Sequence, residues 1–164
     1  MRYIERDIIV ETVERLCIEA SYNIEQDVLD ALQNSYTKEK SPIGKDVLSQ
    51  IIENDLIARN NSVPMCQDTG VVIVFLEIGN EVQIDYDIYD AINEGVRNGY
   101  KHGYLRKSVV RHPLDRVNTN DNTPAVIHTK LISGDKINLL IAPKGAGSEN
   151  MSLVKMLTPA DIFT

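Results

Sequence analysis

A short β-branched segment, Val71–Ile78, constrains the fold more than any other part of the sequence. It reads Val-Val-Ile-Val-Phe-Leu-Glu-Ile. A run of this length and composition is typical of a strand buried in a sheet, and it is far shorter than the ~20 apolar residues needed to cross a bilayer. Residues 60–70, directly before it, are rich in turn and helix-breaking residues. The sequence therefore predicts a loop that leads into a buried strand, and no membrane span.

Helical periodicity dominates the residues before this strand. Apolar residues recur at near-helical spacing from Ile4 to Ala20, and a second helix is expected from about Glu25 to Tyr36. Ser41-Pro42 supplies a cap and a first-turn proline for a third helix. Helical spacing returns from Ile88 to Val96, where Gly95 would let another element approach closely.

The second half of the chain predicts further strands. Two strand-like runs, residues 125–132 and 137–142, are joined by Ser133-Gly134-Asp135-Lys136, which indicates a hairpin turn. Helices first and strands later favour an α+β fold, with N-terminal helices packed on a largely antiparallel or mixed sheet. No repeat or linker divides residues 1–164, so we expect a single domain.

The charge balance argues against a nucleic-acid partner. The 164 residues contain 17 Lys plus Arg against 24 Asp plus Glu, a formal net charge of −7, which repels a polyanion. The N-terminus, Met-Arg-Tyr-Ile-Glu-Arg-Asp, is charged throughout and lacks the apolar core of a secretion signal. We therefore expect a cytoplasmic protein.

The two cysteines lie in different settings, and a structural disulfide between them is not expected in a cytosolic chain. Cys17 lies on the apolar stripe of the first expected helix, which indicates simple core packing. Cys66 lies in the loop before the buried strand, where Gly70 can adopt positive φ and the thiolate could face a cleft. From spacing alone, an inert cysteine packed in the loop is the more common interpretation of Cys66.

Two further segments could bind anions. Residues 99–116 concentrate basic groups in an otherwise acidic chain, and Arg106 is the best placed of them to clamp a carboxylate with its planar fork. A solvated charged face is the alternative. Gly145 and Gly147, after the last expected strand, could expose backbone N–H groups as an anion-binding nest; a plain strand-exit turn is the alternative there.

Taken together, four ordered segments resemble the α subunit of two-subunit, iron–sulfur-dependent class I fumarate hydratases. These segments are Pro64–Gly70, Gly103–Ser108, Asn118–His128 and Lys144–Asn150. The resemblance covers nearly the whole chain. It implies a [4Fe-4S] cluster that is held by three cysteines, with one iron left open for substrate, and it places the first of these metal ligands at Cys66.

The resemblance also implies roles for the neighbouring residues. Gln67 would bind substrate, and Asp68 would be a catalytic residue within the hydrogen-bonding network of the site. Arg106 would clamp a substrate carboxylate, and Gly145 and Gly147 would bring backbone groups to the same cavity.

The implied reaction is the reversible hydration of fumarate to (S)-malate, a step of the tricarboxylic acid cycle, with the open iron acting as a Lewis acid. In the family the principal proton donor lies in a β subunit or its fused equivalent, so we expect a β-subunit partner within a homo- or hetero-oligomer. The two remaining cluster ligands would lie beyond Thr164. We therefore expect a chain truncated at its C-terminus, which neither assembles the cluster nor is active alone.

Three alternatives remain open. L-tartrate dehydratase shares the Cys-Gln-Asp-Thr-Gly loop, although Gly-Tyr-Leu-Arg-Lys-Ser and Gly-Ser-Glu-Asn resemble fumarase more closely. A non-catalytic dicarboxylate-binding or assembly module would keep the carboxylate clamp and contact a partner chain. A cysteine-nucleophile hydrolase ranks last, because the sequence places no histidine beside Cys66.

Overall fold

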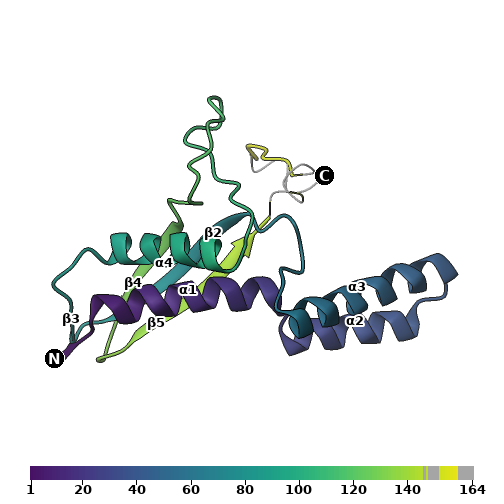
Figure 1. The fold of residues 1–164 in the computed structure, drawn as a ribbon, viewed down its shortest axis with the longest axis horizontal. Coiled ribbons are helices and arrows are strands. Elements are labelled where there is room, and N and C mark those ends of the chain that lie inside the picture. The colour runs from purple at the N-terminus through teal and green to yellow at the C-terminus, as the bar shows by residue number, and fades with distance from the viewer. Residues whose placement is uncertain (146, 148–151, 159–164) are drawn as a thin grey trace.

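The computed structural model describes residues 1–145, 147 and 152–158. In chain order the elements are β1 (Arg2–Tyr3), α1 (Arg6–Tyr22), α2 (Gln26–Lys38), α3 (Pro42–Asn61), β2 (Val71–Gly79), β3 (Val82–Gln83), α4 (Ile88–His102), β4 (Val126–Ile132) and β5 (Ile137–Lys144) (Figure 1). The four predicted helices and three longer strands are confirmed. No helix in this part of the chain combines the length and apolarity that a membrane span requires.

The main sheet has three strands, and β2 is its central strand. β4 pairs with β2 in parallel, and β5 pairs with the other edge of β2 in the antiparallel sense. β1 and β3 form a separate two-stranded parallel pair that the sequence pattern did not predict. N-terminal helices on a mixed sheet confirm the predicted α+β fold.

The predicted hairpin between β4 and β5 is wrong, because β2 lies between these two strands. β2 is the most apolar strand, and the central position covers both of its edges. The turn after β4 instead crosses the end of β2. There Gly79 N donates to Lys136 O at 2.8 Å, and Glu81 N donates to Gly134 O at 2.9 Å.

Helices α1 and α4 pack side by side across one face of the sheet (Figure 1). Alternation along β2 directs Val72, Val74 and Leu76 into this layer, where each is at most 1% exposed. Other members of the core come from both helices and include Val13, Cys17, Ile92 and Val96. The prediction that Cys17 packs in the core is confirmed, because its side chain is 0% exposed.

Two glycines of α4 let the helices approach closely. A Cβ added at Gly95 would lie 2.6 Å from the carbonyl oxygen of Val10, and one at Gly99 would lie 2.9 Å from Cβ of Cys17. Real Cβ atoms do not come this close to their neighbours. The predicted close approach at Gly95 is therefore confirmed, and α1 is the element that approaches.

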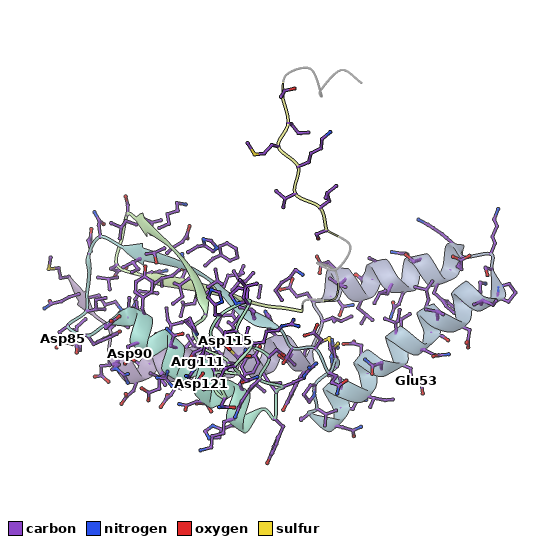
Figure 2. The ribbon with its side chains drawn as sticks, turned by 90° about the horizontal axis from the view of Figure 1, so that it is seen from above. Glu53, Asp85, Asp90, Arg111, Asp115 and Asp121 are labelled. Atoms are coloured by element: carbon purple, nitrogen blue, oxygen red, sulfur yellow. The ribbon has the colours of Figure 1, made fainter. Side chains whose placement is uncertain are left out.

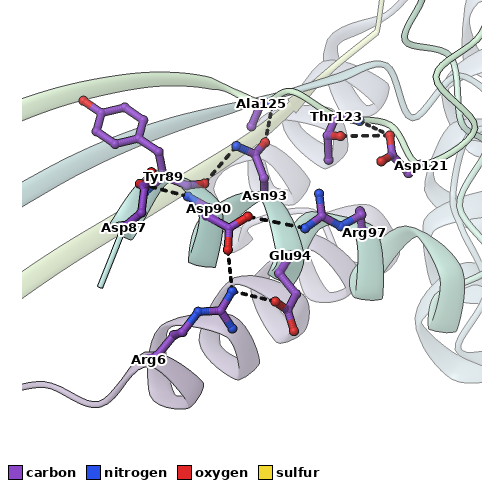
Figure 3. A network of polar contacts seen from close by, with 10 residues as sticks. All are labelled: Arg6, Asp87, Tyr89, Asp90, Asn93, Glu94, Arg97, Asp121, Thr123 and Ala125. Atoms are coloured by element: carbon purple, nitrogen blue, oxygen red, sulfur yellow. Dashed lines mark hydrogen bonds and ion pairs between the residues drawn. The ribbon is translucent and has the colours of Figure 1, made fainter. Parts of the chain in front are cut away.

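Polar contacts on the outer side of α4 fix its position between α1 and β4 (Figure 3). The guanidinium of Arg6 in α1 donates to Asp90 at 2.6 Å and to Glu94 at 2.7 Å. One turn along the helix, Asn93 Oδ1 accepts from the backbone N of Ala125 at 2.9 Å. α4 is thus joined to the start of α1 and to the start of β4.

Helices α2 and α3 form an arm that extends away from the sheet (Figure 1). Figure 2 shows Glu53 of α3 far from Asp85 and Asp90 at the opposite end of the molecule. The predicted cap of α3 is confirmed, since Ser41 Oγ accepts from Gly44 N at 3.3 Å. The second face of the sheet carries a stacked Phe75–His128 pair, and within the described residues Phe75 remains 48% exposed.

Candidate functional site

The loop that follows α3 brings Cys66 to the surface of the sheet-containing body. Ser62, at the end of α3, has φ +53 and turns the chain out of the helix. The backbone of Met65 is held from two sides, because its N donates to Ser21 O at 3.0 Å and its O accepts from Asn54 Nδ2 at 2.8 Å. The next residue, Cys66, is an exposed free thiol, and Gln67 beside it is also exposed.

The end of β5 lies directly against this loop. Gly70 has φ +62, and a Cβ on it would lie 1.9 Å from the carbonyl oxygen of Lys144. A Cβ on Gly145 would lie 3.0 Å from Oδ2 of Asp68. The structure therefore brings Asp68 and Gly145 together, although they are far apart in the sequence.

A partly buried hydrogen bond joins the same loop to the segment that carries Arg106. Thr69 Oγ1 donates to the carbonyl oxygen of Arg106 at 2.8 Å, and Thr69 is only 6% exposed. Tyr100 OH in turn donates to Thr69 O at 2.8 Å. Burial raises the pKa of Tyr100 well above its ordinary value, so this hydroxyl stays protonated and can donate. The guanidinium of Arg106 is exposed and pairs with no other described residue.

Asn122 is the residue of this network that the sequence analysis missed. Its side chain is 0% exposed. Its Oδ1 accepts from the backbone N–H groups of Ser108 at 2.8 Å and Val109 at 3.2 Å, and its Nδ2 donates to Gly70 O at 3.0 Å. The signals in the sequence are its place in the Asn118–His128 segment and the concentration of asparagines in residues 118–122. One asparagine amide can supply both a donor and an acceptor to a buried turn.

A cavity of about 120 Å³ opens beside these residues. Its lining includes Cys66, Asp68 and Thr69 from the loop and Pro143 from β5. This volume is below the roughly 300–1,000 Å³ of a typical small-molecule pocket. Larger hollows among the described residues lie along α1 and β5, and neither Cys66 nor Arg106 lines them.

Gly147, the last of the predicted site residues, is exposed, and a Cβ on it would have no neighbour within 4 Å. Residue 146 and residues 148–150 of the predicted anion-binding nest lie outside the described residues. The structure thus groups Cys66, Asp68, Gly145 and the backbone of Arg106, with Gln67 beside them, but shows no contact from Gly147 to the group.

The described residues could supply one thiolate ligand to a metal cluster. The Cys66 thiol is accessible, whereas Cys17 is fully buried, and its burial raises the pKa of the thiol to about 12. Thiolates are the ligands that iron–sulfur clusters require, so Cys66 is suited to bind iron and Cys17 is not. In residues 1–145, 147 and 152–158 there is no group of three His, Cys, Asp or Glu side chains that could hold a metal ion.

Comparison with known proteins identifies the family. The family model described as fumarate hydratase (Fumerase) matches residues 10–164. The chain is 43% identical, over 94% of its length, to a Methanocaldococcus jannaschii protein provisionally named as an L(+)-tartrate dehydratase subunit alpha. It is 34% identical, over 83% of its length, to the aerobic class I fumarate hydratase of Escherichia coli K12.

The chain spans 55% of the Methanocaldococcus protein and 25% of the Escherichia coli enzyme. An L(+)-tartrate dehydratase subunit alpha of Escherichia coli UTI89 is 26% identical over 93% of the chain. Relatives of both names therefore align with most of this chain. The match to the family model over residues 10–164 shows that this chain belongs to the fumarate hydratase (Fumerase) family.

Proposed function

We propose that this chain forms part of a hydro-lyase that reversibly hydrates fumarate to (S)-malate. The observation that carries the proposal is the hydrogen bond from Thr69 Oγ1 to Arg106 O. It joins a loop with an accessible thiol to a segment whose guanidinium pairs with no other described residue. A thiolate that binds iron and a fork that binds a carboxylate are the two groups needed to hold a dicarboxylate at a metal.

In this proposal Cys66 supplies one ligand to a [4Fe-4S] cluster, and the other ligands come from outside the described residues. When bound, the cluster supplies a Lewis-acidic iron that stabilises negative charge next to a carboxylate. Arg106 binds the second carboxylate and so fixes the orientation of the substrate. Asp68 accepts hydrogen bonds beside the reacting atoms, while Gln67 and the backbone of Gly145 contact the substrate.

A β subunit is the proposed partner. The relatives from Methanocaldococcus and from Escherichia coli UTI89 are both named as alpha subunits. We infer that the proton donor of the reaction lies on that partner. The isolated 164-residue chain is accordingly expected to remain colourless after anaerobic treatment with iron and sulfide, and to be inactive.

L-tartrate is the second candidate substrate. The Methanocaldococcus relative, at 43% identity, carries the tartrate name. Tartrate and malate are both four-carbon dicarboxylates that carry a hydroxyl group next to a carboxylate. The same clamp and the same metal ligand would therefore serve either dehydration.

Activity of the chain together with its β partner, prepared without oxygen, tests the proposal. Fumarate hydration and tartrate dehydration are measured side by side, with visible absorption as the readout for the cluster. Cys66→Ser is expected to abolish both the absorption and the activity. Cys17→Ser, the same chemical change in the core, is the matched control and should keep the cluster.

Arg106 has its own control in Arg111, an exposed arginine of the same connecting segment (Figure 2). Arg106→Lys should raise KM at least tenfold, because a bidentate contact is lost, whereas Arg111→Lys should not change it. Activity on tartrate alone would favour the second candidate. Tight dicarboxylate binding without turnover or cluster would instead show a non-catalytic binding module, and absence of both binding and turnover would refute the proposal.

A further inference from the structure

We propose that Asn122 is a positioning residue, which sets the distance between the Cys66 loop and the Arg106 segment and thereby the length of dicarboxylate that the site accepts. The inference rests on the proposed function. It starts from an observation that this function leaves unexplained, namely a fully buried amide that bridges the two segments without touching the exposed groups proposed to bind substrate.

The bridge is formed by one planar amide. Asn122 Oδ1 accepts from Ser108 N and Val109 N, which follow Arg106 by two and three residues. On its other side Nδ2 donates to the carbonyl oxygen of Gly70, at the end of the loop that begins with Cys66. An asparagine is suited to this task because its short side chain offers a donor and an acceptor in one rigid plane.

Neighbouring contacts make the bridge rigid. Asn118 Nδ2 donates to Lys107 O at 2.9 Å, and Thr119 N donates to Val109 O at 3.0 Å, so the segment returns to the body in a fixed path. Asn122 itself has φ +63, a left-handed conformation that asparagine adopts more readily than most residues. The amide is therefore held in place before any substrate binds.

The consequence for binding is geometric. A dicarboxylate held at Cys66-bound iron by one end and at Arg106 by the other is sensitive to the separation of the two segments. A displaced Arg106 loses its paired contact with the far carboxylate, and this weakens substrate binding. The Asn122 amide contacts only backbone groups. It therefore affects substrate binding indirectly, by fixing the position of Arg106.

Three variants separate this role from a general loss of structure. Asn122→Gly removes the amide but retains the positive φ. Asn122→Asp retains the acceptor for Ser108 and Val109 but loses the donor to Gly70. Asn120→Gly is the matched control, because Asn120 has φ +68, is exposed, and makes no side-chain hydrogen bond to another described residue.

The first measurement uses this chain and hydrogen–deuterium exchange. In Asn122→Gly the amides of Ser108 and Val109 should exchange faster, since their acceptor is lost. Both amides should stay protected in Asn122→Asp and in Asn120→Gly. Unchanged exchange in Asn122→Gly would overturn the bridge itself.

The second measurement uses the active complex with the β partner. Asn122→Gly and Asn122→Asp should raise KM about tenfold while kcat stays within about threefold, since binding of the far carboxylate is lost. The ratio of inhibition constants for succinate and glutarate should move toward one in both variants. An Asn122 that only stabilised the fold would lower the melting temperature without changing this ratio.

A double-mutant cycle completes the test. If Asn122 acts through the guanidinium, Asn122→Gly should have little further effect on KM in the Arg106→Lys background. If the two substitutions raise KM by independent factors that multiply in the double variant, the proposal is overturned. Equal KM values for Asn122→Gly and Asn120→Gly would also overturn it.

If the wild-type complex neither hydrates fumarate nor dehydrates tartrate, the proposed function fails. The same comparison is then made on the Kd for succinate: weaker binding by Asn122→Gly than by Asn120→Gly supports the positioning role, and equal binding overturns it.

Discussion

Replacement of Gly70 by alanine tests the contact on which the geometry of the site depends. Gly70 has φ +62, and a Cβ there would lie 1.9 Å from Lys144 O and 2.5 Å from Gly145 N. Both are backbone atoms at the end of β5, so no side-chain rotation can relieve the collision. Either the loop or the end of the strand has to move.

The size of the effect follows from these distances. A carbon–oxygen contact needs about 3.3 Å, so the end of β5 must shift by more than about 1 Å. The left-handed backbone costs alanine about 1–2 kcal/mol, and overpacking against fixed groups costs a further 1–3 kcal/mol or so. We therefore expect Gly70→Ala to lower the free energy of unfolding by about 2–5 kcal/mol, a large part of the ~5–15 kcal/mol of a typical domain.

Urea denaturation followed by circular dichroism measures this loss, and Gly134→Ala is the control. Gly134 has φ +109, but a Cβ on it would meet nothing within 4 Å. The control therefore reports backbone strain without collision. Gly70→Ala should lose about 1–3 kcal/mol more than Gly134→Ala. If the two variants lose the same stability, β5 does not end against Gly70, and the placement of Gly145 beside Asp68 is wrong as well.

Three further outcomes are expected for the isolated chain. Iodoacetamide should modify only Cys66 in the native state and both cysteines in urea, as counted by mass spectrometry, and two native adducts formed at equal rates would contradict the burial of Cys17. Burial raises the pKa of Cys17 from 9.0 to about 12, so the thiol ionises first in the unfolded chain. Its contribution to stability is complete below pH 9 and is lost as the pH rises toward 12, at up to about 1.4 kcal/mol per pH unit, and Cys17→Ala should flatten this alkaline decline in urea titrations. Gly95→Ala should destabilise the chain, because overpacking of about 1–3 kcal/mol against Val10 and Val13 exceeds the ~1 kcal/mol gain in helix propensity; a more stable variant would show that α1 does not approach Gly95.

Local signals in the sequence were sufficient for most of the elements. The Ser41-Pro42 pair predicted the start of α3, because a cap depends on adjacent residues. Gly95 predicted a close approach but not the element that makes it, because its neighbours Val10 and Val13 are distant in the sequence. The β4–β5 hairpin was wrong because strand order depends on which strand most needs to be buried. A turn sequence carries no information on that competition.

In the candidate site, too, local features could be predicted and long-range contacts could not. The exposure of Cys66 agrees with the breaker-rich loop around it, and the buried position of Cys17 agrees with its place on a helical stripe. The role of Asn122 could not be predicted, since its bond to Gly70 joins residues 52 positions apart. Such a contact exists only after the two segments have been brought together by the fold.

The central place of β2 has a consequence for how this chain folds during synthesis. β2 ends at Gly79, but its two neighbours begin only at Val126 and Ile137. A growing chain therefore emerges from the ribosome with its most apolar strand unpaired on both edges until these residues follow. Late pairing between distant segments slows folding and exposes aggregation-prone strand edges. Of the two elements that cover this face of β2, α1 is already synthesised at that stage and α4 is not.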